Sequence, residues 1–398
     1  MFNAPPSDRT SILPGFLILY AALYLAYGTQ SAYLPAFLQS HGLAVEQIGL
    51  VLAAGTVIRI GAGPLTGRLA DYLEARKQLL ALAACLSGFI GLTYNLAFGF
   101  AALLVVSMLH AASTASLAPL SDALSVEAAR ERAFQYGWVR GAGSIAFIGG
   151  TLASGQLIDR FGLSSIILTS SAFFLIMAIC AAIMRGPAEG PHSAEAYDGG
   201  AIRALLGIAA YRRLLIIAFL VIGSHALNDT YAVIQWRRAG YDNLSISLMW
   251  SEAVVAEVVV FFLVGPWLIE RLGVAGAAAL SAGAAMLRWS VMASTSEMPA
   301  LIGSQALHGL TFALLHLAAM GIMARFVPDR LAATAQTIYG TGALGIASAI
   351  MTTASGYLYG MFGAKSFWAM AACCAIALPL TRRLKFRSNS GRGVATRG

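Results

Sequence analysis

Charged residues are scarce in this sequence. Asp, Glu, Lys and Arg make up 11% of its 398 residues, whereas a water-soluble globular protein has about 25%. Water is therefore not the main solvent of this chain. The formal net charge is +8, but the basic residues are spread over short segments and do not build the basic face that binding to nucleic acid requires. We predict no nucleic-acid partner.

Motifs for catalysis, metal binding and secretion are also absent from the sequence. It contains no HExxH, no Ser–His–Asp signature and no glycine-rich cofactor loop, so we predict no enzymatic activity, no metal and no cofactor. The first apolar stretch is too long for a cleavable signal peptide. The cysteines give neither a disulfide framework nor a metal-ligand spacing. All four lie in apolar stretches: Cys85, Cys180, Cys373 and Cys374.

Long apolar stretches dominate the chain instead. Hydrophobic residues make up 58% of it, and the mean hydropathy is +0.74. Stretches of roughly 20 residues, enough to cross a ~30 Å hydrocarbon core as helices, recur from end to end and lack the alternation of a membrane β-barrel. We predict an all-α membrane protein with twelve transmembrane helices, at about residues 14–38, 47–69, 78–97, 100–122, 136–157, 164–184, 212–236, 246–268, 274–293, 299–323, 332–355 and 366–381.

Two phrases of the sequence recur about half a chain length apart. TLASGQLIDRFG begins at Thr151 and TTASGYLYGMFG at Thr352, an offset of 201. GPLTGRLAD begins at Gly63 and GPWLIERLG at Gly265, an offset of 202. A weaker echo at an offset of 198 sets one Tyr and Gly pair against another: Tyr33 and Gly42 against Tyr231 and Gly240. Nearly constant offsets indicate two halves built on one plan.

Six predicted helices fall in each half, which we place at residues 1–184 and 212–398, with a polar linker at 185–211 between them. If the N-terminus is cytoplasmic, 19 of the 26 Lys and Arg lie in cytoplasmic segments, as the positive-inside rule favours. We therefore expect a monomeric, multi-pass protein of a bacterial inner membrane, with both termini and the linker in the cytoplasm. Four of the other basic residues lie on the outer side of the membrane in this placement: Arg160, Arg237, Arg238 and Lys365. The remaining three lie within predicted helices: Arg59, Arg140 and Arg288.

This arrangement resembles the major facilitator superfamily, whose two six-helix halves rock about a central site. Members typically carry, after the second helix, a Gly, an Asp four residues later and a short basic cluster. The corresponding residues here are Gly67, Asp71, Arg76 and Lys77. The match is partial, because Tyr72 and Glu74 replace the usual Arg and Gly, and the repeat at 265–273 lacks the Asp altogether. The resemblance implies a secondary transporter in which Asp71 and Arg76 help to gate the movement of the halves.

Charges inside the predicted helices of the first half are candidates for function, because each costs on the order of 2.5–3.5 kcal/mol in the bilayer interior. Arg59 lies near the membrane midplane, and no carboxylate of the first half shares its depth. It could bind an anionic substrate, since a guanidinium matches the two oxygens of a carboxylate, or it could bridge to the other half. Asp122 and Arg140 share one helix end and are expected to pair as a structural bridge or gate.

In the second half, Asp229, Glu252 and Arg288 share the periplasmic third by residue count and are expected to form one structural charge cluster. Glu257 lies deeper, near the middle of its helix. Burial disfavours the charged form of an ionisable group, so a buried carboxyl beside histidines can exchange protons near physiological pH. We assign proton coupling to Glu257 with His225, His308 and His316, although a neutral histidine hydrogen-bonded between helices is the alternative.

Further polar and aromatic residues share the predicted depth of the central site. Tyr20, Tyr24 and Tyr27 follow one face of the first helix, and Gln30 lies just beyond. Such a stripe can line a cavity for a ring, or it can be packing. Asn228 is three residues from His225 and shares its helical face. Our predicted substrate-binding set is Arg59, Tyr27, Gln30, His110 and Asn228.

Within the superfamily, several stretches resemble the phenylpropionate permease group of proton symporters. They include YGWVRGAGSIAF, SHALNDTYAVIQWRRAGY, WSEAVVAEVVVF and LHGLTFALLHLAAM, and the likeness runs from about residue 16 to 380. The resemblance supports functional roles for eight residues: Arg59, Asp122, Arg140, His225, Glu257, Arg288, His308 and His316. Asp229 and Glu252 stand where that group usually has uncharged residues, so the ligand here can differ.

The sequence as a whole predicts a proton symporter that imports a small organic acid, first of all an aromatic carboxylate, by alternating access. Its expected partners are the solute, protons and the lipid bilayer, with the proton gradient as driving force. A symporter for a neutral sugar or nucleoside is the main alternative, and a drug/proton antiporter is a weaker one. A membrane enzyme or receptor is disfavoured, because neither a catalytic constellation nor a sizeable output domain is present.

Overall fold

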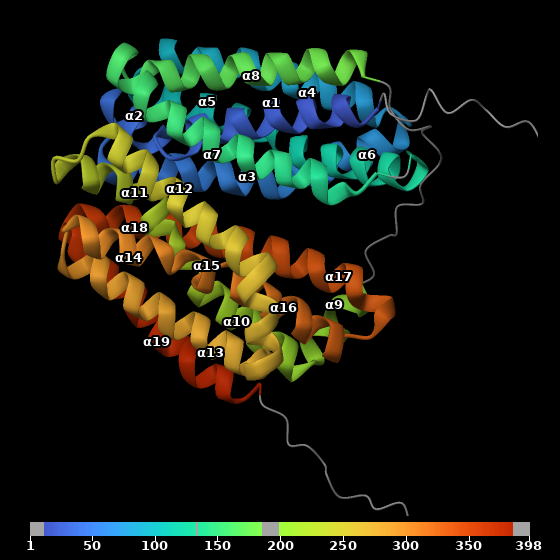
Figure 1. Cartoon of the computed structure of the whole chain (residues 1–398), viewed down its shortest axis with the longest axis vertical. Coiled ribbons are helices and arrows are strands. Elements are labelled where there is room, and N and C mark those ends of the chain that lie inside the picture. Colours follow the sequence, from blue (N-terminus) through green and yellow to red (C-terminus); the bar gives the residue numbers. More distant parts are fainter. Residues whose placement is uncertain (1–11, 133, 185–198, 385–398) are drawn as a thin grey trace, which may run out of the picture.

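The computed structural model describes residues 12–132, 134–184 and 199–384, and every regular element within these ranges is a helix. The helices run side by side in two groups (Figure 1). The first group holds α1 (Leu13–Ser31), α2 (Leu34–Ser40), α3 (Val45–Tyr72), α4 (Arg76–Thr93), α5 (Gly99–Thr114), α6 (Leu117–Arg132), α7 (Tyr136–Phe161) and α8 (Ser164–Ile183).

The second group follows α9 (Gly199–Gly207), a helix that occupies part of the predicted linker; residues 185–198 of that linker lie outside the described residues. It holds α10 (Ala209–Gly223), α11 (His225–Arg238), α12 (Asn243–Val259), α13 (Gly265–Ser294), α14 (Met298–Ala306), α15 (His308–Thr311), α16 (Ala313–Phe326), α17 (Ala332–Ile338), α18 (Ala347–Phe362) and α19 (Phe367–Arg382). Two π-helical segments, η3 (Val260–Val264) and η5 (Tyr339–Ile346), continue α12 and precede α18.

Each of the twelve predicted ranges overlaps a helical stretch of the structure. In the described residues, eight segments are long and apolar enough to cross a membrane by length and composition. Helix α13 runs through the boundary predicted between the ranges 246–268 and 274–293. Gly273 interrupts it there with a φ of 66°, a conformation that glycine adopts without a steric penalty. The all-helical prediction is confirmed, and the number of membrane spans stays a prediction.

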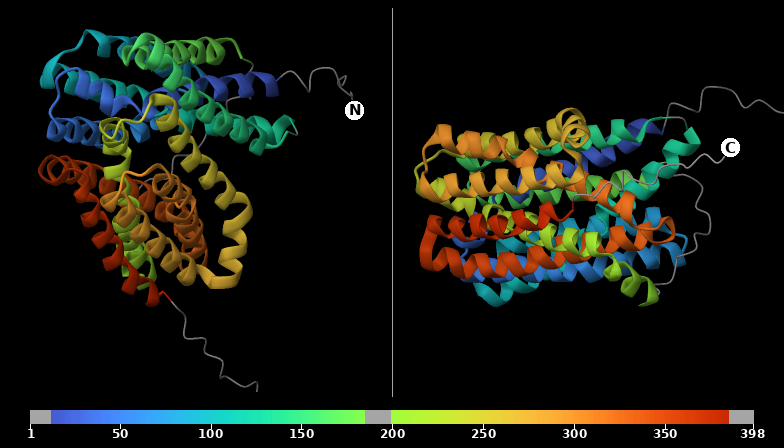
Figure 2. Two further views of the ribbon diagram at one scale, coloured as in Figure 1. Left: turned by 60° about the vertical axis from the view of Figure 1, so that its left-hand side comes forward. Right: turned by 90° about the horizontal axis from the view of Figure 1, so that it is seen from below.

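Two opposite faces of the helix bundle can be distinguished. The terminal face is the one at which α1 begins and α19 ends, and the far face carries the turn from α2 to α3 and the turn from α11 to α12 (Figure 2). Both of these turns end a helix at a glycine with positive φ, Gly42 at 89° and Gly240 at 91°. A residue in the left-handed conformation commonly ends a helix. Gly42 and Gly240 stand at equivalent positions in the sequence because the same turn occurs in both halves.

Hydrogen bonds join the two groups at the far face. The Tyr33 hydroxyl, from the first group, donates to the Asn243 carbonyl at 2.6 Å and lies 2.8 Å from Ser247 Oγ. The Tyr231 hydroxyl, from the second group, donates to the Val45 carbonyl at 2.8 Å. Tyr33 and Tyr231 are the echoed pair of the sequence, so each group extends the same tyrosine to the other. We call these two side chains the tyrosine latches.

The repeated phrase lies on the same seam. A Cβ atom on Gly155 would be 2.6 Å from the Asn243 carbonyl oxygen, and one on Gly356 would be 3.2 Å from the Glu46 carbonyl oxygen. Only glycine lets α7 approach α12, and α18 approach α3, this closely. The phrase occurs twice because each group needs a small residue where the other group packs against it.

The apolar core shows that the groups are joined at one face and separate at the other. One buried cluster runs from the far-face part of the first group, including Tyr33 and Phe37, into the second group. A second cluster, including Phe16 and Leu124, stays within the first group near the terminal face. There a cavity of about 550 Å³ separates α7 from α12 and η3. The structure is thus closed at the far face and parted at the terminal face.

Candidate functional site

A cavity of about 610 Å³ lies between the two groups of helices. Its volume falls within the ~300–1,000 Å³ of small-molecule sites. Helices α1, α3 and α5 supply most of its wall, and α11 and α18 supply the rest from the second group. Four of the five predicted substrate-binding residues line it: Tyr27, Gln30, Arg59 and His110. Asn228 does not.

Arg59 is the cationic centre of this cavity. It lies 14 residues after Val45 in the 28-residue α3, halfway along the helix, and its side chain is exposed to the cavity that it lines. No hydrogen bond or ion pair joins it to any residue in the ranges that the structure describes. The bridge to Glu257 or Asp229 that the sequence left open is therefore not formed, and the guanidinium is available to a ligand.

Aromatic and polar side chains surround Arg59. Tyr27 donates to the Thr114 carbonyl at 3.1 Å, which fixes its ring at the wall. Gln30 accepts a hydrogen bond from Ser170 Oγ at 2.9 Å. His110 is only 5% exposed and packs edge-on against Tyr94, with 5.5 Å between ring centroids, and its Nε2 has no partner among the described residues. The wall therefore offers ring faces beside the cation, whereas His110 Nε2 is itself buried.

The second group contributes an anion to the same cavity. Asp229 lines it, although the sequence suggested a place for Asp229 in a structural charge cluster. The Asn228 amide donates to Asp229 Oδ1 at 3.2 Å. Asn228 itself is 4% exposed and does not line the cavity, so it supports Asp229 from behind. This location was not predicted, because residue count gives the depth of a side chain and not the side of the helix that it faces.

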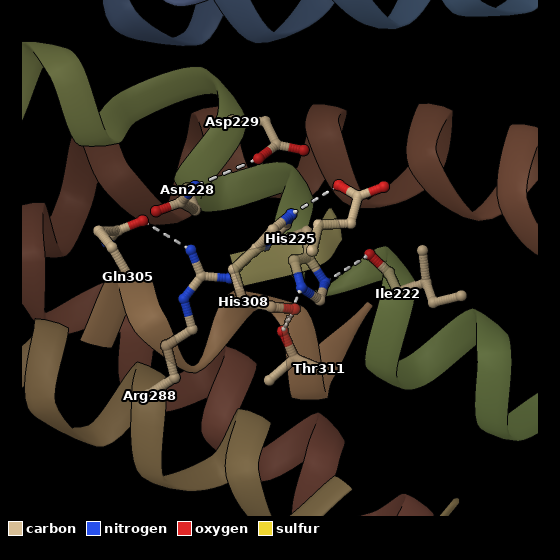
Figure 3. Close-up of polar contacts among 9 residues, drawn as sticks. Ile222, His225, Asn228, Asp229, Arg288, Gln305, His308 and Thr311 are labelled. Carbon is tan, nitrogen blue, oxygen red and sulfur yellow. Dashed lines mark hydrogen bonds and ion pairs between the residues drawn. The ribbon is translucent and has the colours of Figure 1, made fainter. Parts of the chain in front are cut away.

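A polar network fills the interior of the second group next to this cavity (Figure 3). Glu257 Oε2 lies 3.6 Å from His308 Nε2, His308 Nδ1 lies 2.9 Å from Arg288 Nη1, and Arg288 Nη2 donates to Gln305 Oε1 at 2.8 Å. Gln305 was missed from the sequence, although it stands one turn before His308 in the chain.

The network fixes the tautomer of one histidine. A guanidinium can only donate hydrogen bonds, so His308 Nδ1 must accept the one from Arg288. The ring proton of neutral His308 is then on Nε2, which faces the Glu257 carboxylate. Arg288 thereby holds His308 in the form that presents its proton to Glu257.

His225 lies against the same network. Its ring centroid is 5.3 Å from that of His308. Its Nδ1 lies 3.0 Å from the Val221 carbonyl and its Nε2 lies 2.9 Å from Thr311 Oγ1. A carbonyl can only accept, so Nδ1 carries a proton, and the Thr311 hydroxyl can donate to Nε2 or accept from it by rotating. His225 can therefore be satisfied in both its neutral and its protonated form.

One predicted grouping in the second half is corrected by the structure. Asp229, Glu252 and Arg288 do not form a cluster: Arg288 is fully buried and its partners are His308 and Gln305. Neither Asp229 nor Glu252 has an ion pair within the described ranges, since neutral hydrogen-bond acceptors on α14 and α15 reach the guanidinium first. His316 lies apart from the other histidines, between the rings of Phe261 in η3 and Tyr339 in η5.

In the first half, the predicted Asp122–Arg140 pair is also wrong. Asp122 accepts hydrogen bonds from the hydroxyls of Tyr20 and Tyr136, the latter at 2.8 Å. Arg140 donates to the Tyr24 hydroxyl instead. The tyrosines of α1 thus separate the two charges, and only Tyr27 of the predicted stripe reaches the cavity.

The loop after α3 forms its own ion pairs. Arg76 donates to Asp71 Oδ1 from Nη2 at 2.6 Å and from Nε at 2.8 Å. Its Nη1 also approaches Glu127 Oε2 of α6 at 3.4 Å. The two residues predicted to act together are therefore in contact, and Glu127 joins them across the terminal face.

The architecture and the sequence can be compared with known proteins. A family model, the MFS_1 like family, matches residues 13–370. The chain belongs to this family. It is a membrane transporter of the major facilitator superfamily, as the resemblance of its loop motif and repeat predicted, and not an enzyme.

Relatives of this transporter cover nearly its whole length. It is 31% identical over 370 residues to the probable 3-phenylpropionic acid transporter of Escherichia coli (strain K12), which covers 90% of this chain and 94% of the relative. It is 26% identical over 377 residues to the maltose permease of Geobacillus stearothermophilus, with 94% of each chain covered.

Solved structures agree in fold at low sequence identity. A point mutant of the nucleoside transporter NupG superposes with a TM-score of 0.85 at 15% identity, covering 93% of this chain and 99% of that one. A bacterial homologue of the lysosomal transporter Spinster gives a TM-score of 0.76 at 12% identity, covering 96% and 98%. These likenesses establish the fold of this transporter.

Proposed function

We propose that this transporter is a proton symporter that acts as a monomer and imports a small organic acid, with aromatic carboxylates as the first class. The observation that carries the proposal is Arg59, a cation without a partner among the described residues, in a cavity between the two groups. An unpaired charge inside a membrane protein is costly, and a carboxylate bound by both of its oxygens would compensate it.

The walls of the cavity suit a ring. Tyr27, Tyr94 and His110 present aromatic edges and faces close to Arg59, and aromatic pairs favour offset or edge-on contacts. A probable 3-phenylpropionic acid transporter among the relatives supports an aromatic acid as the first ligand class to test.

Proton coupling is assigned to Glu257 with His308 and His225. Support comes from the 3.6 Å approach of Glu257 to His308 and from the two hydrogen-bonding states open to His225. The network lies directly behind Asp229. A change in the charge of the network therefore acts over a short distance on the groups that line the cavity. His316 lies between two aromatic rings and interacts electrostatically with Glu257, which keeps it in the proposed set.

Transport across the membrane follows from alternation of the two faces. The distribution of Lys and Arg assigns the terminal face to the cytoplasm of a bacterium. In this assignment the tyrosine latches close the periplasmic side, and the parted helices α7 and α12 open the cytoplasmic side. The structure then corresponds to the state that releases solute inward.

A symporter for a neutral sugar or nucleoside is the second candidate. It is favoured by one observation, that a carboxylate as well as a guanidinium lines the cavity, since hydroxyl groups can bind both. The maltose permease and the nucleoside transporter among the similar proteins make it worth testing.

Binding of matched ligands to purified protein tests the proposal. We expect 3-phenylpropionate to bind at least about tenfold more tightly than its amide, a difference of about 1.4 kcal/mol. Arg59→Lys should remove this preference, because an ammonium does not reproduce the bidentate fork. Arg237→Lys, an exposed arginine at the far face, is the matched control and should bind as the wild type does. Equal binding of acid and amide would contradict recognition of a carboxylate and favour a symporter for neutral solutes.

A further inference from the structure

The cavity carries two charges of opposite sign, and we infer that it is built for a dipolar ligand. Such a ligand has a carboxylate for Arg59 and, at its other end, a hydrogen-bond donor for Asp229. The donor is a hydroxyl or an ammonium group. This inference rests on the proposed recognition of a carboxylate by Arg59, and it adds a second recognition point that a plain aromatic acid would leave empty.

The orientation of Asp229 is the first argument. Between residues 225 and 236, α11 is buried at every position except Asp229. Asp229 is also among the residues that line the cavity. In Figure 3 its carboxylate lies on the side of the network nearest the first group of helices. Thr230 also lines the cavity, but the only exposed residue of this stretch is the carboxylate Asp229, and the cavity that it faces contains Arg59.

The incomplete hydrogen bonding of Asp229 is the second argument. Its Oδ1 accepts from Asn228 at 3.2 Å, and Oδ2 has no donor from the residues described. No cation within those residues pairs with the carboxylate, although Arg288 is fully buried nearby and turns to Gln305 and His308 instead. Because Asp229 is exposed to the cavity, water can bond to this oxygen, and a ligand group can displace that water. Here one oxygen is left for something that enters the cavity.

Arg59 and Asp229 do not neutralise each other, which is the third argument. Their side chains face one cavity without an ion pair between them, so a ligand can lie between the two charges. A ligand with only one polar end would leave the opposite charge without a partner when it displaces water. Sites that hydrogen-bond a particular chemical group discriminate strongly against analogues that lack it. The donor at the second end of the ligand should therefore contribute to selectivity.

Three series of ring-substituted 3-phenylpropionates provide the test. They carry a hydroxyl, an aminomethyl or a methyl group at the meta or para position, and the methyl compounds serve as apolar controls of similar size. We expect the better isomer of the hydroxyl or the aminomethyl series to bind wild-type protein at least about tenfold more tightly than its methyl counterpart, or about 1.4 kcal/mol.

Variants of Asp229 identify the partner of the donor. Asp229→Asn keeps an acceptor oxygen without the charge, so an advantage of the ammonium should be lost while an advantage of the hydroxyl persists. Asp229→Leu should abolish both advantages and bind the methyl compound at least as tightly as wild type does, because no carboxylate is then left without a partner; this binding also shows that the variant is folded. Glu252→Gln is the control, because it changes a carboxylate on α12 that does not line the cavity.

Several results would overturn the inference. One is equal binding of all three series to wild-type protein, and another is a donor advantage that survives in Asp229→Leu. A third is an Asp229→Asn protein that binds all probes as wild type does but no longer accumulates them, because Asp229 would then be a proton site. In each case the preference for acid over amide still tests Arg59 separately, so failure of this inference differs from failure of the proposed function.

Discussion

The two halves of this transporter place different chemistry at the same positions of a repeated scaffold. Tyr27, Arg59 and His110 of the first half line the cavity. Adding 198, the offset of the tyrosine latches, gives His225, Glu257 and His308, which lie in or against the polar network of the second half. The first set is open to a ligand and contains a cation that no described residue pairs with. The second set does not line this cavity and contains the opposite charge.

The correspondence is structural as well as numerical. Arg59 lies 14 residues after the first residue of α3, Val45, and Glu257 lies 14 residues after the first residue of α12, Asn243. Equal distances from the helix start place both charges about 21 Å along their helices. Duplication therefore supplied two equivalent positions, which now carry opposite charges.

Neutralising the charge of the second set should have the largest effect. Glu257→Gln is expected to abolish accumulation of substrate against a gradient in proteoliposomes, while exchange of labelled for unlabelled substrate continues. Net uptake requires the carrier to load and release a proton, whereas exchange at equal proton load does not. Glu252→Gln, on the same helix but with no ion pair among the described residues, should accumulate substrate normally. Uncoupler-sensitive accumulation by Glu257→Gln would remove Glu257 from the coupling role.

Arg59 and Arg288, one in each half, should differ in their contribution to stability. Arg288→Met leaves His308 Nδ1 and Gln305 Oε1 without their donor. Each unsatisfied buried acceptor costs about 1–3 kcal/mol, so we expect a clear fall in the thermal unfolding temperature of the purified protein. Arg59→Met removes a charge with no partner among the described residues and should unfold at or above the wild-type temperature. Equal destabilisation by both would mean that Arg59 has a structural partner.

The tyrosine latches allow the seam between the halves to be tested from both sides. Tyr33→Phe and Tyr231→Phe each remove hydrogen bonds worth about 0.5–1.5 kcal/mol net, so the state open at the far face should gain roughly two- to tenfold in population. Spin labels at the exposed positions 40 and 244, in a variant without native cysteines, would report the separation. Tyr241→Phe breaks a bond to the Ser296 carbonyl within the second half and should leave the distances unchanged.

The smallest expected difference concerns the starts of α3 and α12. Asp242 caps α12 by accepting from the Ser245 backbone N–H at 2.7 Å, whereas the equivalent cap of α3 is Ala44. Asp242→Ala should lower the free energy of unfolding by about 0.5–2 kcal/mol at neutral pH. Ala44→Asp should raise it by part of that amount, because it supplies an acidic cap to α3.

The effect of Asp242 also has a defined pH dependence. The backbone hydrogen bond from Ser245 holds the pKa of the Asp242 carboxyl below its ordinary value of 3.8. Its contribution is therefore complete above that value and is lost as the pH falls through the lower pKa of the folded state. Unfolding curves of wild type and Asp242→Ala should differ at pH 7 and converge as the pH falls below the ordinary value of 3.8. A difference that persisted in strong acid would contradict the charged cap.

Sequence alone identified the fold because hydrophobic length and an internal repeat are properties of the chain itself. The same reasoning located Arg59, Tyr27, Gln30 and His110 at the depth of one cavity, which they do line. Their roles in binding stay predictions. Depth along a helix follows from counting residues, and so this part of the site was accessible.

The incorrect pairings share one physical cause. Counting residues gives the height of a side chain but not its direction around the helix, and it ignores neutral groups that compete for a charge. Asp122 and Arg140 do not pair with each other, because each forms hydrogen bonds with tyrosine hydroxyls instead. Gln305 and His308 accept the hydrogen bonds of Arg288, so that Arg288 interacts with Asp229 electrostatically but forms no ion pair with it. These competitors become visible only when the helices are packed together.

The π-helical segment η3 ends immediately before Gly265, the start of the second Gly-Pro pair. From the first residue of the helix to this pair is 18 residues in the first half (63 − 45) and 22 in the second (265 − 243). The second copy is longer by four residues, about 6 Å of α-helix. If one half is superposed on the other at the far face, the two helices are therefore out of register by about one turn toward the terminal face. The correspondence between the two halves is therefore kept at the far face, where the tyrosine latches lie, and lost toward the terminal face, where α7 and α12 are parted.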